Sequence, residues 1–332
     1  MPPKMRLPRP LKNSHRNNSL SKRARPFLGK TGSLWSYFME SIMFSLPSRY
    51  IPGSLLIPVL TISLFLTSCT GLLTDTVIKP AIGNLQQQTD INLVCEGAPA
   101  YLLMLDSMLA NTPGNKDLLL TATQSFSAYA EALTECGGSS ERIEAITDKA
   151  HLYGKKLLNH SLPLNTSQNS EIFDRKLATL GKCDIEKVFW GTFGWITWVR
   201  SQKGSPGSIA DLVIIEKIMA RLLKIDESFQ NGSIHLFFGG YYAAKPAILG
   251  GRMDLSKIHF EKALALGHRK LLVTQVTYAE TYARMTMDKE LHDNLLKEVL
   301  AFPLADAPES ALVNRIAKNR AQKLLDENYF GE

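Results

Sequence analysis

The four cysteines offer the most definite chemistry in this 332-residue chain, because a thiol can be acylated, oxidised or bound to a metal ion. Cys69 ends the run Leu66-Thr67-Ser68-Cys69, which directly follows an almost wholly apolar segment at residues 51–66. No two cysteines stand at a metal-binding separation. Cys69 is therefore the candidate for modification, and the candidates for disulfide formation are Cys95, Cys136 and Cys183.

The run that ends at Cys69 resembles a bacterial lipobox, in which the cysteine is acylated and becomes the first residue of the mature protein. An uncleaved transmembrane helix is the alternative, and it needs roughly 20 apolar residues. Residues 51–66 are fewer and contain Pro52, Gly53 and Pro58. Their length is closer to the apolar region of a signal peptide, about 7 to 15 residues. We therefore expect a lipoprotein signal peptide at residues 43–68 and a lipid on Cys69.

The positive net charge of the chain, +7, is concentrated in the leader. Residues 1–68 contain ten Lys and Arg and a single acid, Glu40, so residues 69–332 retain 28 basic and 30 acidic residues. The mature net charge of −2 removes the argument for nucleic-acid binding. Residues 1–42 are a basic extension that cannot bury a core. We interpret them as the result of a start assigned too early, with Met43 or Met39 as the true start; a cytoplasmic tail is the alternative.

Sequence motifs for catalysis are absent. The chain has neither the paired histidines of a metalloprotease nor a glycine-flanked nucleophilic serine, and its seven histidines are scattered singly. We expect no enzyme, no metal and no cofactor, although an envelope hydrolase of unrecognised type remains an alternative. The predicted function must then depend on the helices that follow the leader.

The mature chain divides into a tether at residues 69–90 and a helical domain at residues 91–330. Apolar residues recur at helical spacing in segments separated by Gly, Pro and Asn, and no strand pattern of useful length interrupts them. The predicted helices cover residues 91–110, 116–134, 140–158, 185–202, 209–227, 233–244, 255–266, 270–287, 289–301 and 309–328. The short connections predict an all-α fold of stacked antiparallel helix hairpins.

Hairpins of this length are typical of a tetratricopeptide-like solenoid. The best local match places Phe260, Ala263 and Leu266 on the second helix of a hairpin, with Gly239, Gly240 and Tyr241 on the first. The intervening loop is longer than that repeat allows.

A further set of segments lies at residues 92–106, 235–242, 259–264, 278–283, 288 and 295–300. Together these segments resemble the TatT family, the lipoprotein components associated with some tripartite ATP-independent periplasmic (TRAP) transporters. The resemblance implies a tetratricopeptide-like protein with a channel, which binds the periplasmic substrate-binding subunit and can form a homotrimer. A generic tetratricopeptide scaffold for envelope assembly, without a small-molecule ligand, is the alternative.

Two aromatic groups are candidates for lining a channel or contacting a ligand. On the helix at residues 185–202, Trp195 and Trp198 point away from a separate apolar face, so they either line a groove or pack between hairpins. Tyrosine hydroxyls can orient a ligand or fill space between helices. The second group of candidates, to which the same two interpretations apply, is Tyr241, Gln275, Tyr278 and Tyr282. On the same helix as Tyr278, the spacing of Glu280 and Arg284 permits an ion pair.

Cys95 and Cys136 lie at similar distances from a turn near Pro113 and Gly114. Both should therefore reach the open end of one antiparallel hairpin, where a disulfide requires Cα atoms within roughly 7 Å. We favour three free, buried thiols, and a disulfide between Cys95 and Cys136 is the alternative. Thr70, immediately after Cys69, resembles the outer-membrane default of lipoprotein sorting, so we expect a lipid-anchored protein on the periplasmic side of the outer membrane.

Overall fold

The computed structural model describes residues 79–164, 170–245, 248 and 250–331. These residues form helices and, within those ranges, no strand, which confirms the predicted all-α class. Three predictions lie outside the described residues: the basic extension at 1–42, the signal peptide at 43–68 and the lipid on Cys69. We therefore describe the helical part alone.

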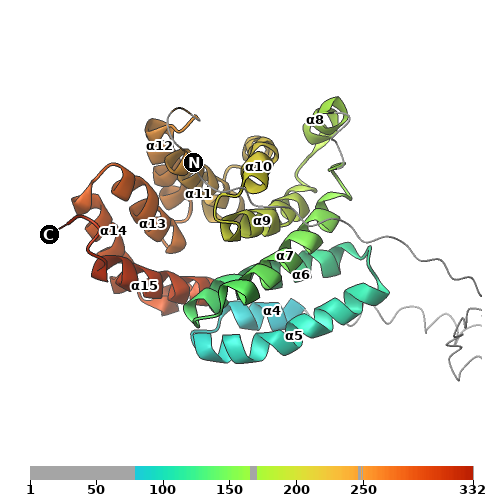
Figure 1. Cartoon of the computed structure of the whole chain (residues 1–332), viewed down its shortest axis with the longest axis horizontal. Helices are drawn as coiled ribbons and strands as arrows, with labels where there is room; N and C mark the ends of the chain where they lie inside the picture. The colour runs from blue at the N-terminus through green and yellow to red at the C-terminus, as the bar shows by residue number, and fades with distance from the viewer. Residues whose placement is uncertain (1–78, 165–169, 246–247, 249, 332) are drawn as a thin grey trace, which may run out of the picture. The chain divides into compact units, whose positions relative to one another are not determined.

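Antiparallel hairpins follow one another along the chain (Figure 1). Consecutive helices pack against each other through most of the array, as the short connections predict. The main helices are α5 (Ile91–Asn111), α6 (Lys116–Glu135), α7 (Ser140–Leu158), α9 (Ile185–Ser201), α10 (Pro206–Ile225), α11 (Phe229–Ala244), α12 (Met253–Leu266), α13 (Val273–Tyr278), α14 (Lys289–Ala301) and α15 (Ala311–Asp326).

Side-chain caps mark the beginning of several helices. The carboxylate of Asp90 accepts from the backbone N–H of Leu93 at the start of α5, and Ser139 accepts from Arg142 at the start of α7. Such caps satisfy N–H groups that have no partner in the first turn of a helix. In α11 the backbone of Gln230, Asn231 and Gly232 is left-handed, so regular helix begins only after Gly232. That position agrees with the predicted start at 233.

Three elements differ from the sequence prediction. Helix α4 (Lys79–Gln86) lies within the expected tether and contacts α6 and α15, and α8 (Ser170–Thr179) lies between the helices predicted at 140–158 and 185–202. The helix expected at residues 270–287 contains a π-helical segment, η3 (Ala279–Ala283), directly after α13. Two 3-10 turns, η4 (Leu304–Asp306) and η5 (Pro308–Ser310), connect α14 to α15.

Small residues let neighbouring helices approach closely. A Cβ atom added to Gly239 of α11 would lie 2.8 Å from the ring of Phe260 on α12, and the hydroxyl of Ser256 donates to the carbonyl of Gly239 at 2.7 Å. Gly194 plays the same part between α9 and α7, where its added Cβ would lie 2.6 Å from the carbonyl oxygen of Ala150. The pairing of Gly239 with Phe260 is the contact expected from the tetratricopeptide-like match.

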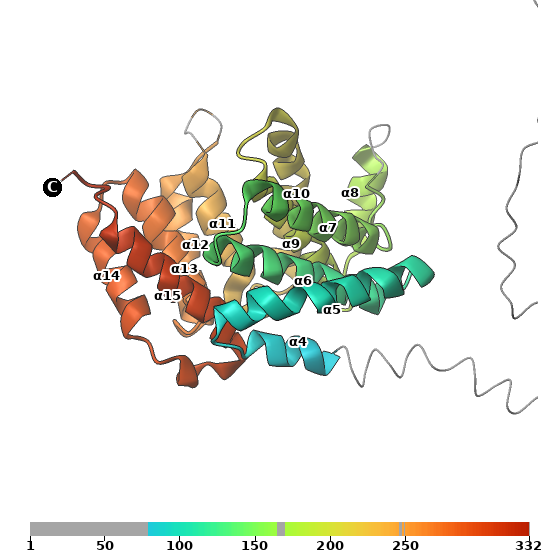
Figure 2. The ribbon, with the colours of Figure 1, turned by 60° about the horizontal axis from the view of Figure 1, so that its bottom comes forward.

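The last helix packs against the first ones (Figures 1 and 2). Helix α15 contacts α4, α5 and α6, and its Leu312 belongs to the same apolar cluster as Leu105 and Leu119 of α5 and α6. Lys323 of α15 also forms a 2.8 Å ion pair with Glu135, whose side chain is only 5% exposed. Residues almost 190 positions apart in the sequence therefore fix the two ends of the array to each other.

Candidate functional site

Trp195 and Trp198 form part of an indole–imidazole cluster with His151 of α7. The His151 ring stacks on Trp198 at a centroid distance of 4.4 Å and lies 5.8 Å from the Trp195 ring. Each indole N–H donates to a carboxylate: Trp195 to Asp211 of α10 at 2.8 Å, and Trp198 to Asp148 of α7 at 2.9 Å. Because these partners come from three helices, the cluster exists only after α7, α9 and α10 have packed.

The electrostatics of this cluster hold His151 in its neutral form. Burial among the indoles lowers the pKa of His151 to about 4, and the positive charge of Lys155 contributes in the same direction. The Nε2 atom of His151 is buried and has no hydrogen-bond partner. The ammonium of Lys155 lies 4.7 Å from the ring of Trp195, close enough for a cation–π contact. A neutral imidazole with a free polar nitrogen is thus held between aromatic surfaces beside a cation.

Tyr278 and Tyr282 lie in a different apolar cluster of the protein. Tyr278 is fully buried, stacks on Phe260 at 4.6 Å and donates from its hydroxyl to Glu261 at 3.0 Å. Burial, with the nearby Glu261 carboxylate, raises the pKa of Tyr278 well above its usual value. Tyr282, whose ring centroid is 5.3 Å from that of Tyr278, is only half-buried.

Gln275 is also fully buried, and its side chain forms hydrogen bonds with a backbone carbonyl and a carboxylate instead of facing an open space. Its amide N–H₂ donates to the carbonyl of Arg269 at 2.9 Å and to Glu298 at 3.2 Å, while its Oε1 has no partner. An unpaired buried carbonyl oxygen of this kind carries a desolvation cost. Gln275 therefore helps to hold α14 against the turn that precedes α13.

Glu280 and Arg284, whose spacing permits an ion pair, are each paired with another residue. Glu280 bonds Arg320 of α15, and Arg284 bonds Glu327 at 2.8 Å. The physical reason is the π-helical turn at η3, which changes the angular spacing between residues four apart. The side chains of Glu280 and Arg284 therefore both pair with residues of the C-terminal segment, Arg320 and Glu327.

Tyr241 of α11 is 7% exposed and lies in the same apolar cluster as Trp195. Its hydroxyl donates to Glu216 of α10 and accepts from Lys245, whose ammonium also lies 3.8 Å from the tyrosine ring centroid. Tyr241 thus connects α10 to the end of α11.

The six predicted ligand-facing residues therefore do not share one surface. Four of them, Trp195, Tyr241, Gln275 and Tyr278, have at most 7% of their surface exposed, so they do not line an open, water-filled channel in this structure. Trp198 and Tyr282 are half-buried and retain surface that a ligand can touch. Ligand contact stays a prediction, and it now applies chiefly to these two.

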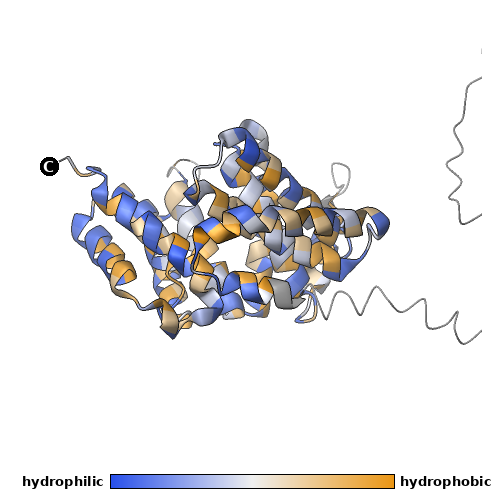
Figure 3. Cartoon of the chain, turned by 90° about the horizontal axis from the view of Figure 1, so that it is seen from below, coloured by the Kyte–Doolittle hydropathy of each residue, from blue (hydrophilic) through white to orange (hydrophobic). Residues whose placement is uncertain are grey.

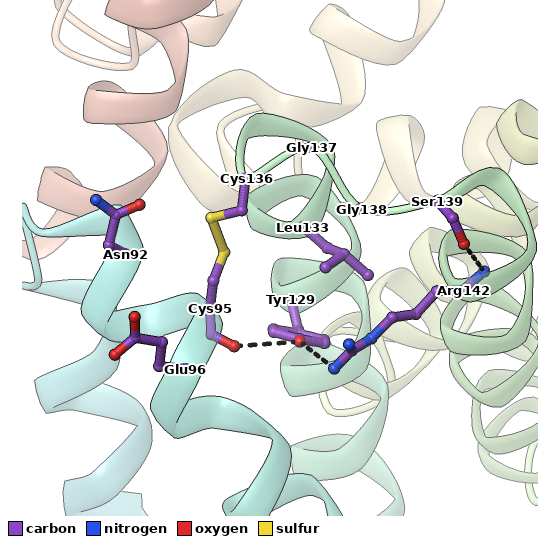
Figure 4. A pocket seen from close by; sticks show the side chains of 10 residues that line it. All are labelled: Asn92, Cys95, Glu96, Tyr129, Leu133, Cys136, Gly137, Gly138, Ser139 and Arg142. Atoms are coloured by element: carbon purple, nitrogen blue, oxygen red, sulfur yellow. Dashed lines mark hydrogen bonds between the residues drawn. A yellow bond between two sulfur atoms is a disulfide. The ribbon is translucent and has the colours of Figure 1, made fainter.

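Cys95 and Cys136 are joined in a disulfide, with their Cα atoms 6.7 Å apart, at the open end of the α5–α6 hairpin. Cys183 is free and exposed. The disulfide forms one wall of a hollow of about 470 Å³, which Figure 4 shows from close by. There the hydroxyl of Tyr129 donates to the carbonyl of Cys95 and accepts from Arg142, both at 3.3 Å. None of the predicted aromatic residues lines this hollow.

A pair of histidines on facing helices was missed by the sequence reasoning. His235 of α11 and His259 of α12 approach to 2.7 Å between their Nδ1 atoms, and Nε2 of His235 lies 3.3 Å from Glu227. Burial lowers the pKa of both rings, that of His259 to about 4. The available signal was their location on the two helices of one hairpin, on either side of the 245–252 loop.

In the described part of the chain, no group of three or more His, Cys, Asp or Glu side chains is arranged to hold a metal ion. The fold, with its close hairpin contacts and aromatic clusters, is that of an all-α protein of stacked helix hairpins.

The comparison with known proteins then gives the family. The sequence model of the TRAP transporter T-component family matches residues 87–330, which is nearly the whole helical domain, and the chain belongs to this family. The chain is also similar to an uncharacterised protein of Treponema pallidum (strain Nichols). The two are 21% identical over 258 residues, which cover 72% of this chain and 79% of that protein. The predicted TatT resemblance is confirmed, and with it a TRAP-associated role in the cell envelope.

Proposed function

We propose that this protein is a lipid-anchored T-component that binds the periplasmic substrate-binding subunit of a TRAP transporter and helps to pass it a small, partly hydrophobic organic ligand. The observation that carries the proposal is the family match over residues 87–330. A match of this extent includes every helix from α5 to α15.

The half-buried aromatic residues support the ligand-passing part of the proposal. Trp198 presents an indole beside the neutral imidazole of His151, and the cation of Lys155 lies over the ring of Trp195. An apolar surface with a few convergent polar groups is typical of small-molecule sites. This combination fits a ligand with an apolar body and an anionic or polar end.

The location follows from the predicted lipobox. We propose that Cys69 carries the lipid, that the domain faces the periplasm, and that the outer membrane is the anchoring membrane. A homotrimer is part of the same proposal, since the TatT resemblance implies it. Exchange of Cys69 for alanine should abolish lipoprotein processing, which mass spectrometry of the membrane fraction would detect; unchanged mass and processing would contradict the lipobox.

A pull-down from periplasmic extract tests the partner. The mature chain is immobilised and the retained proteins are identified, with Trp198→Ala as the ligand-site variant and Val213→Ala, a change at an exposed apolar residue of α10, as the matched control. We expect recovery of a TRAP substrate-binding protein by the wild type and by Val213→Ala. Recovery of envelope-assembly proteins instead would favour the scaffold function.

A further inference from the structure

Helix α5 has an apolar outer face that no other described element covers. Leu93, Leu103 and Met104 are 54%, 67% and 39% exposed. With the exposed Gly97 and Ala100, residues 93, 97, 100 and 104 follow the three- and four-residue spacing that makes one stripe along a helix. Figure 3 shows the hydropathy of the chain from below, the side on which α4 and α5 lie in Figure 1.

The same helix is almost free of charge on this side. It contains no Lys or Arg, and its two acids are Glu96 and Asp106. Asp106 is directed to the neighbouring helix α7, where it bonds Lys149 at 3.0 Å and also accepts from Tyr153. Only Glu96 remains as an exposed charge near the stripe. Transfer of this face out of water therefore costs little in desolvated charge.

By length and composition α5 is the one helix in the described ranges that could cross a membrane. Its inner face, however, is part of the core: Val94, Leu102 and Leu105 are at most 4% exposed. A helix that must keep one face packed against α6 cannot also be surrounded by lipid. It can only lie on a surface.

The length of chain that precedes the helix determines which surface it can reach. Between Cys69 and Lys79, the first residue of α4, the chain has ten steps of at most about 3.6 Å, so α4 lies within roughly 36 Å of an anchored Cys69. Residues 87–90 connect α4 to α5 directly. A tether this short raises the local concentration of the bilayer around α5, so that a narrow apolar stripe suffices for contact.

We propose that the outer face of α5 is a membrane-contact surface, which lies against the headgroups and upper acyl chains of the bilayer that anchors the protein. The inference rests on the proposed lipid anchor at Cys69. Since the face has no basic residue, its contact is apolar and does not depend on anionic lipid or on low salt. The three large side chains of a single helix also fall short of the roughly 800 Å² per partner that a stable dimer buries.

Site-specific quenching tests this surface in the full, lipidated chain. With Cys183 replaced by serine, an environment-sensitive fluorophore is attached to Leu103→Cys, to Leu93→Cys as a second position, or to Val213→Cys on α10 as the matched control, which is 57% exposed. The protein is reconstituted in phosphatidylethanolamine–phosphatidylglycerol vesicles that contain a nitroxide-labelled phospholipid.

We expect a blue shift and loss of emission at positions 93 and 103 and neither effect at position 213, with little change at high salt. Vesicle flotation is measured on the same samples. Protein that floats without quenching at 93 and 103 overturns the membrane-contact proposal alone. Crosslinking between two copies at position 103 without quenching overturns it in favour of self-association. Failure to float overturns the lipid anchor and this proposal together.

Discussion

Alanine at Trp195 should destabilise the protein far more than alanine at Trp198, although the two residues are three positions apart on α9. Trp195 is 2% exposed and its N–H donates to Asp211 at 2.8 Å. Removal of a buried tryptophan side chain costs about 3–5 kcal/mol, because apolar burial is lost and a cavity remains. Trp198 is half-buried and its bond to Asp148 is exposed to solvent, so its removal should cost only about 1–2 kcal/mol.

Thermal unfolding of the mature chain, followed by circular dichroism, measures the difference. In a domain of about 250 residues each kcal/mol shifts Tm by roughly 2–4 °C, so Trp195→Ala should lower Tm by about 6–20 °C and Trp198→Ala by only a few degrees. Trp195→Phe, which keeps much of the packing but loses the bond to Asp211, should be intermediate. Equal shifts for the two alanine variants would refute the assignment of Trp195 to the core and Trp198 to an accessible surface.

Three further outcomes are expected. Cys95→Ser should destabilise the chain by roughly 3–4 kcal/mol, because the disulfide closes a 41-residue separation; unchanged denaturant midpoints with and without reductant would contradict this. His259, whose pKa falls from 6.5 to about 4 on folding, binds a proton more readily in the unfolded chain, so its contribution to stability should be complete above pH 6.5 and be lost toward pH 4. His259→Gln should therefore flatten the dependence of Tm on pH between those values, and a parallel curve would exclude this role. Expression from Met43 should still give export, whereas retention in the cytoplasm would show that residues 1–42 are needed.

Much of the secondary structure could be predicted from local signals. Helices α5, α6, α7 and α14 begin and end within one residue of their predicted bounds, because Asp, Asn or Ser residues cap their first turns and Gly, Pro or Asn residues interrupt the helical pattern between them. Helix α4 was missed because it has only eight residues, two of which, Pro80 and Gly83, are typical of a tether, and it forms where α6 and α15 provide surfaces for it to pack against.

The sequence by itself determined the all-α class, the order of the hairpins, the family resemblance and the proximity of Cys95 to Cys136, since each depends on spacing along the chain. Only the tertiary structure decided which aromatic residues are buried. Trp195 is less exposed than Trp198 because α7 and α10 cover it more completely. The spacing of apolar residues within α9 does not predict this difference. The pairing of His235 with His259, the ion pairs of Glu280 and Arg284, and the return of α15 to α6 were likewise decided by contacts between distant segments, whose geometry depends on how the helices pack.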